Sequence, residues 1–81
     1  MSTTYVFAKA TGCSVTRIPN AKSAALKQYL AKNFALYDGE VKSEWILWIL
    51  KGFNAGKHVS VQYFRNGKVV VNNLDIKEIV L

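Results

Sequence analysis

The side chains that could carry out chemistry are few and widely separated in this sequence. His58 is the only histidine and Cys13 the only cysteine, so a nucleophile–base pair would have to join these two, or a serine and His58. Nothing in the spacing indicates such a pair. One cysteine and one histidine also fall short of the four ligands of a structural zinc site, and no Walker-type glycine loop precedes a predicted helix. The sequence therefore predicts a non-catalytic protein without a metal or a cofactor.

Positive charge is concentrated in the first half of the chain. The sequence has 81 residues, of which 11 are lysine or arginine and 5 are aspartate or glutamate, and its net charge is +6. Residues 1–37 contain no acidic side chain, whereas residues 38–81 contain all five. Such an excess attracts phosphates or acidic protein faces. The cations of the first half, which are candidate partner-binding residues, are Lys9, Arg17, Lys22, Lys27 and Lys32.

An aromatic residue and two cations meet at one predicted hairpin tip. Phe64 and Arg65 come before or at the turn marked by Asn66-Gly67, and Lys68 follows it. Phe64 is expected on the strand face opposite the core. Proteins that bind single-stranded nucleic acid stack bases on exposed aromatic rings beside a cationic groove. Phe64, Arg65 and Lys68 are therefore candidate binding residues, and the alternative is an ordinary exposed hairpin.

The apolar run Trp45-Ile46-Leu47-Trp48-Ile49-Leu50 has two interpretations. Residues 40–51 are predicted to form a helix ended by Gly52, although a short apolar run does not distinguish a helix from a buried strand by its period alone. One interpretation places this helix wholly in the core. In the other, the two tryptophans together with Ile46, Leu47 and Leu50 exceed what one helix face can bury. The exposed part of the helix is then a partner surface or a homodimer seam through Trp45 and Trp48.

The elements before this run are predicted to be two strands and a helix. Residues 5–8 and 13–18 have strand character, and a turn signal at Thr11-Gly12 lies between them. An extended loop is the alternative for residues 13–18. Asn20 is the predicted N-cap of a helix over residues 21–37, because its side-chain oxygen can accept a free backbone N–H. Gly39 is predicted to end that helix in a left-handed conformation.

The elements after the run are predicted to be a hairpin and a short strand. Residues 57–64 and 68–72 are strands, and a three-residue loop at 65–67 gives the register that gathers the apolar side chains on one face. These side chains are Val59, Val61, Tyr63, Val69 and Val71. Residues 74–76 predict a helical turn and residues 79–81 a final strand. A C-terminal helix is the alternative, since Asp75 and Glu78 have capping-box spacing.

These elements predict a single α+β domain over residues 1–81, in which two helices cover one face of an antiparallel sheet in the order β-β-α-α-β-β-short β. Its hydrophobic content of 51% is typical of a globular protein. A lone cysteine indicates a reducing compartment, and we expect a cytoplasmic protein with no signal peptide and no membrane contact. No known family is identified: the helix junction lacks the Gly-x-x-Gly clamp of KH domains.

Two functions follow from these observations. The first is a small inhibitor- or adaptor-like protein, of the kind that phages and mobile elements encode, which docks on an acidic face of a larger protein. The second is phosphate-driven, weakly sequence-selective nucleic-acid binding through the seven cations named above. The first is favoured because arginine is scarce and the lysines of the first helix, five residues apart, are spread around its axis.

Overall fold

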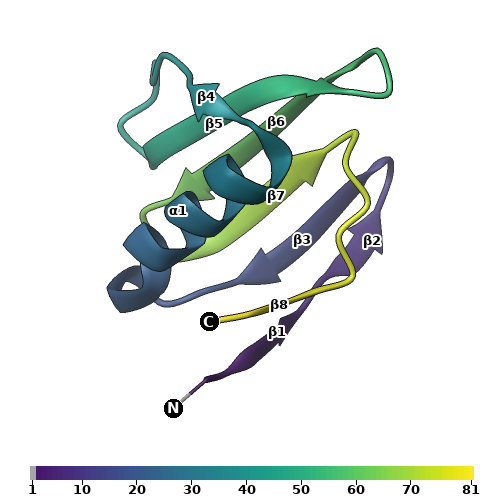
Figure 1. Cartoon of the computed structure of the whole chain (residues 1–81). Helices are drawn as coiled ribbons and strands as arrows, with labels where there is room; N and C mark the ends of the chain where they lie inside the picture. The colour runs from purple at the N-terminus through teal and green to yellow at the C-terminus, as the bar shows by residue number, and fades with distance from the viewer. Residues whose placement is uncertain (1) are drawn as a thin grey trace.

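The protein combines antiparallel strands with one α-helix. The computed structural model describes residues 2–81, and Figure 1 shows its elements. In chain order these are β1 (Thr4–Val6), β2 (Ala8–Ala10), β3 (Cys13–Arg17), the 3₁₀ turn η1 (Asn20–Lys22), α1 (Ser23–Phe34), β4 (Tyr37–Asp38), β5 (Ile46–Asn54), β6 (Lys57–Phe64), β7 (Lys68–Asn72) and β8 (Glu78–Val80). The α+β class is confirmed, but residues 2–81 contain one α-helix where two were predicted.

The strands form two antiparallel sheets. Six strands make a large sheet in the order β2-β3-β7-β6-β5-β4, and β1 pairs with β8. Helix α1 lies across one face of the large sheet (Figure 1). The ends of the described chain lie together, because Thr3 and Leu81 exchange two backbone hydrogen bonds of 2.7 and 2.9 Å. Helix α1 covers one side of the large sheet, and within residues 2–81 no helix lies on the other side.

The core lies between α1 and the large sheet. Leu26 and Leu30 are one helical turn apart, and both are fully buried against apolar residues of the strands. Tyr63 of β6 is also fully buried, and the ring of Trp48 stacks on it at a centroid distance of 5.2 Å. The Tyr63 hydroxyl lies 2.6 Å from the carbonyl oxygen of Ile18, so this buried polar group has a partner.

The predicted register of the β6–β7 hairpin is confirmed. Tyr63 pairs with Val69 and Val61 with Val71 across the loop at 65–67, and all four side chains are buried. Gly67 has a φ of +93°, and a Cβ atom there would lie 3.0 Å from the carbonyl oxygen of Ile18. Both the backbone conformation and the close approach therefore require glycine at this position.

The predicted helix over residues 40–51 is wrong, because the apolar run forms strand β5. Trp48, Leu50 and Gly52 alternate onto the helix side of the sheet. A register shift between Ile46 and Trp48 interrupts the period of two, so the run looked apolar on every side. Gly52 does not end a helix. It leaves space for the chain after α1, since a Cβ atom there would lie 2.6 Å from the Leu36 Cδ2 atom.

This correction also removes the predicted homodimer seam through a helix carrying Trp45 and Trp48. Trp48 is half-buried and packs on the core against Tyr63. Trp45 comes just before β5 and is 67% exposed. The two tryptophans therefore do not form one surface on a helix.

Helix α1 is shorter than the predicted residues 21–37. It ends at Phe34, and the left-handed C-cap residue is Ala35, with a φ of +53°, and not Gly39. Asn20 is not its N-cap. The Asn20 Oδ1 atom lies 2.8 Å from the Tyr63 hydroxyl, and its Nδ2 atom donates to the carbonyl oxygen of Arg65 at 3.2 Å. Asn20 thus ties the segment before α1 to β6 and the following loop.

The predicted strands near the two ends of the chain are present with changed partners. The first strand is divided at Phe7: β1 pairs with β8, and β2 pairs with β3. The final strand is confirmed, which excludes the alternative C-terminal helix. The helical turn predicted at residues 74–76 is wrong. Leu74 and Ile76 lie in a segment without regular secondary structure, and their buried side chains pack in the core.

Candidate functional site

The candidate site is the face of the large sheet that points away from α1, which we call the open face. In the part of the chain that the structure describes, no helix covers it. Strand residues alternate between the two faces, and the registers place on the open face positions 13, 15 and 17 of β3, 68, 70 and 72 of β7, 58, 60, 62 and 64 of β6, and 49, 51 and 53 of β5. Positions 8 and 10 of β2, 37 of β4 and 46 of β5 complete it.

The open face is positively charged. Its cationic side chains are Arg17, Lys51 and Lys68, and all three are exposed. Arg17 and Lys68 are direct cross-strand partners, so two cations stand side by side at one end of the face. Across residues 2–81, none of the strand positions that face this way holds aspartate or glutamate. The positive charge of the open face therefore has no partner within the strands.

The opposite side of the sheet is different, because carboxylates from the second half of the chain pair with cations of the first half. The Lys9 Nζ atom lies 2.8 Å from the Asp75 Oδ1 atom, and the Lys27 Nζ atom lies 2.8 Å from the Asp38 Oδ1 atom. The hydrogen bond from Lys9 lowers the pKa of Asp75 below its usual value. Lys22 donates to the carbonyl oxygen of Leu81 at 3.4 Å.

These contacts correct the expectation that the first half displays only uncompensated cations. Lys9 and Lys27 are ion-paired, while Lys32 is exposed on α1. Of the five candidate cations of the first half, Arg17 alone stands on the open face. These five residues therefore lie on different sides of the molecule and do not form one patch.

The predicted hairpin cluster is partly brought together. Phe64 and Lys68 both stand on the open face, and Arg17 joins Lys68 from β3. The Arg17 Nη1 atom donates to the carbonyl oxygen of Asn66 at 3.4 Å. Arg65 points elsewhere: its Nε atom donates to the carbonyl oxygen of Glu44. The cationic end of the open face is thus formed by Arg17 and Lys68 beside Phe64.

A groove of about 600 Å³ runs between the open face and the loop before β5. Its floor includes Ile49, Ser60 and Gln62, and its wall is the loop over residues 39–45, which contributes Glu40 and Lys42. Ser60 accepts a hydrogen bond of 3.1 Å from the Asn72 side chain. The floor of the groove therefore combines apolar, amide and hydroxyl groups, and its wall carries one carboxylate and one ammonium group.

Exposed aromatic rings border the other end of the open face. Phe53 and His58 are cross-strand partners whose ring centroids lie 4.4 Å apart at an interplanar angle of 41°. Phe53 is 61% exposed, and Tyr37 on the edge strand β4 is 56% exposed. Rings exposed to this extent are available to contact a ligand.

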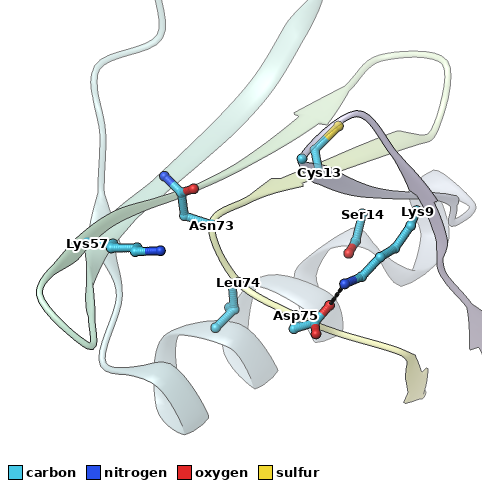
Figure 2. Close-up of a pocket in the computed structure, with 8 residues that line it drawn as sticks. Lys9, Cys13, Ser14, Lys57, Asn73, Leu74 and Asp75 are labelled. Carbon is cyan, nitrogen blue, oxygen red and sulfur yellow. Dashed lines mark ion pairs between the residues drawn. The ribbon is translucent and has the colours of Figure 1, made fainter.

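A second hollow of about 330 Å³ lies at the end of β3 and is shown in Figure 2. Its lining includes Cys13, Ser14 and Lys57, and the Lys9–Asp75 ion pair stands at its side. The Cys13 thiol donates to the carbonyl oxygen of Ala10 at 2.9 Å. The ammonium group of Lys9 is already paired, so this hollow offers fewer free charges than the open face.

No recognisable metal or membrane-spanning feature is present among residues 2–81. No group of three or more histidine, cysteine, aspartate or glutamate side chains is placed to hold a metal ion. No helix within these residues is long and apolar enough to cross a membrane. The sequence matches no protein-family model and no curated protein, and the structure matches no solved structure.

Sequence reasoning missed part of the open face for one reason. Lys51 and Phe53 had been placed at or beyond the end of a helix, whereas β5 brings them opposite Ser60 and His58. The signal that could have identified them is the segment Asn54-Ala55-Gly56-Lys57. A glycine-containing turn between two apolar segments indicates a hairpin, and Ala55 and Gly56 both have positive φ angles there.

Proposed function

We propose that this protein is a non-catalytic module that binds nucleic acid through phosphate contacts on its open face, with weak sequence selectivity. The observation that carries the proposal is the unequal distribution of charged side chains between the two sides of the sheet. Carboxylates pair with Lys9 and Lys27 on the helix side, while Arg17, Lys51 and Lys68 stand on a face whose strands hold no acidic side chain. A polyanion complements such a face.

The two reasons for favouring an acidic protein partner carry less weight in the folded chain. The lysines of α1 are indeed dispersed, but α1 covers the other side of the sheet and is not part of the proposed surface. Arginine is scarce in the sequence, yet Arg17 stands next to Lys68 and beside an aromatic ring. Contacts to phosphate need positive charge more than they need arginine.

Docking on an acidic protein face is the second candidate, and one observation favours it. Trp45 is 67% exposed at the start of β5, and Arg65 lies beside it, because the Arg65 backbone N–H donates to the carbonyl oxygen of Trp45 at 2.8 Å. Tryptophan and arginine are the side chains that most often anchor protein interfaces. A partner bound there would contact an edge of the sheet and would leave the open face free.

The proposal is tested by the salt dependence of oligonucleotide binding. Replacing both Arg17 and Lys68 with glutamine removes two phosphate contacts, so we expect weaker binding and a slope of log affinity against log salt that is smaller by about 0.7 for each contact. Fluorescence anisotropy with a labelled oligonucleotide at several salt concentrations measures both quantities.

The matched control replaces Lys32 and Lys77 with glutamine. This variant has the same net charge, but Lys32 is on α1 and Lys77 is in the segment before β8, so neither stands on the open face. We expect its salt slope to remain close to that of the original protein. Equal losses in the two variants would show that net charge alone attracts the oligonucleotide, and the proposed surface would be wrong.

A further inference from the structure

Resting on the proposed function, we propose that the open face binds a single strand of nucleic acid in preference to a duplex. Arg17 and Lys68 contact phosphates at one end of the face, and the Phe53–His58 pair stacks on a base at the other. The two ends are connected by β6, in which Phe64 and His58 both point to the open face.

The aromatic pair is the observation that favours a single strand. The Phe53 side chain is 61% exposed and its ring lies 4.4 Å from that of His58, centroid to centroid. Exposing a phenylalanine ring to water is unfavourable, and stacking the ring on a base removes its apolar surface from water. The faces of the bases are free in a single strand and are covered by neighbouring bases inside a duplex.

The distance between the two ends fits a short strand. Phe64 and His58 are separated by six residues along β6, which corresponds to about 20 Å at the usual rise of a β-strand. A nucleic-acid strand covers that length with about six nucleotides at an axial spacing of roughly 3.4 Å, and with fewer when it is extended. One strand can therefore contact the cationic end and the aromatic end together.

The lining of the groove indicates how the bases and the sugar–phosphate backbone of the bound strand are oriented on the open face. Glu40 is the carboxylate among its lining residues, and it stands on the loop wall next to the edge strand, away from Arg17 and Lys68. Lys42 and Lys51 line the same groove, so the Glu40 carboxylate is not an isolated negative charge there. Gln62 and Ser60 on the floor can exchange hydrogen bonds with a base edge. The sugar–phosphate backbone is placed along the β3–β7 side because Arg17 and Lys68 stand side by side there, and the bases point toward Gln62 and Ser60.

The test compares four probes of about ten nucleotides. These are an unstructured DNA strand, the same sequence as RNA, its DNA duplex, and a DNA strand with abasic positions. Phe53→Leu keeps an apolar side chain of similar size but removes the ring. The matched control is Trp45→Leu, which removes a similarly exposed ring that is not on the open face. Thermal unfolding of each variant confirms that it folds.

We expect Phe53→Leu to weaken binding of the single strands about 5- to 150-fold, the effect of losing one stacked base, and to leave duplex binding unchanged. Trp45→Leu should leave all affinities unchanged, and the abasic strand should bind more weakly than the complete one. A preference for RNA or for DNA would identify which of the two is the better ligand.

Two outcomes would overturn the inference while leaving the proposed function intact. One is that the single strand and the duplex bind with equal affinity, and that replacing Arg17 and Lys68 with glutamine weakens both. The other is a complete strand and an abasic strand that bind alike. Absence of binding to all four probes, by contrast, would overturn the proposed function itself.

Discussion

Tyr63 joins the sheet to the segment that leads into α1. Its side chain is fully buried, and its hydroxyl lies between the carbonyl oxygen of Ile18 and the Oδ1 atom of Asn20, at 2.6 and 2.8 Å. Both neighbours accept hydrogen bonds, so the neutral phenol is the form that fits this position. Burial accordingly raises the pKa of Tyr63 above its usual value of 10.0.

This raised pKa predicts a loss of stability in alkaline solution. The unfolded chain releases the Tyr63 proton near the usual pKa of 10.0, while the folded chain retains it. The contribution of Tyr63 is therefore complete below that pH and is lost as the pH rises through the higher folded pKa. Tyr63→Phe should be less stable by about 1 kcal/mol at neutral pH, because the buried acceptors lose their donor.

The difference in the free energy of unfolding between Tyr63→Phe and the original protein should become smaller above the usual tyrosine pKa, by at most about 1.4 kcal/mol for each pH unit. Urea unfolding at several pH values measures it. Tyr37→Phe is the matched control: Tyr37 is 56% exposed, so its replacement should change the free energy of unfolding at neutral pH very little. Parallel stability curves for the Tyr63→Phe variant and the original protein would contradict the account of this residue.

Strand β5 shows at the scale of the element why part of the fold was predictable and part was not. The β6–β7 hairpin was predicted correctly because its apolar residues alternate and Asn66-Gly67 marks the turn. In β5, Trp48 and Leu50 face the core, while Ile46 and Ile49 line the groove on the other side. Both faces are therefore apolar, and the irregular register near Leu47 conceals the period of two.

The residues of the candidate site were likewise predictable only where their strands were. Phe64 and Lys68 were placed on the correct hairpin, because that hairpin was predicted correctly. Lys51 and Phe53 were missed with β5. The pairing of Lys9 with Asp75 and of Lys27 with Asp38 joins residues distant in sequence, and no local pattern indicates which carboxylate a lysine will meet.

The close packing of β5 against the chain after α1 predicts a coupled effect of two substitutions. A methyl group at position 52 would lie 2.6 Å from the Leu36 Cδ2 atom, so Gly52→Ala should destabilise the protein by about 1–3 kcal/mol through overpacking. In a Leu36→Ala background the obstructing atoms are gone, and the same substitution should be much less destabilising.

A double-mutant cycle of chemical unfolding measurements gives this coupling free energy. Leu36 is buried, so its truncation will be destabilising by itself, and only the interaction between the two positions is informative. Additive effects of Gly52→Ala and Leu36→Ala would mean that β5 does not pack against this segment as described.

At the scale of the whole molecule, the fold converts a charge asymmetry along the sequence into one between the two sides of a sheet. The cations of residues 1–37 are divided: two are paired with carboxylates on the helix side, and Arg17 is placed on the open face with Lys51 and Lys68. The net charge of +6 thus indicates an anionic partner, but the sheet decides which surface meets it.

An amide NMR titration of the labelled protein with an unstructured oligonucleotide tests this central claim most directly. We predict that the signals that move belong to the open-face strands, among them those of Arg17, Lys51, Phe53 and Lys68, while the signals of α1 (Ser23–Phe34) stay in place. Movement centred on α1, or no movement at all on addition of excess oligonucleotide, would contradict the account.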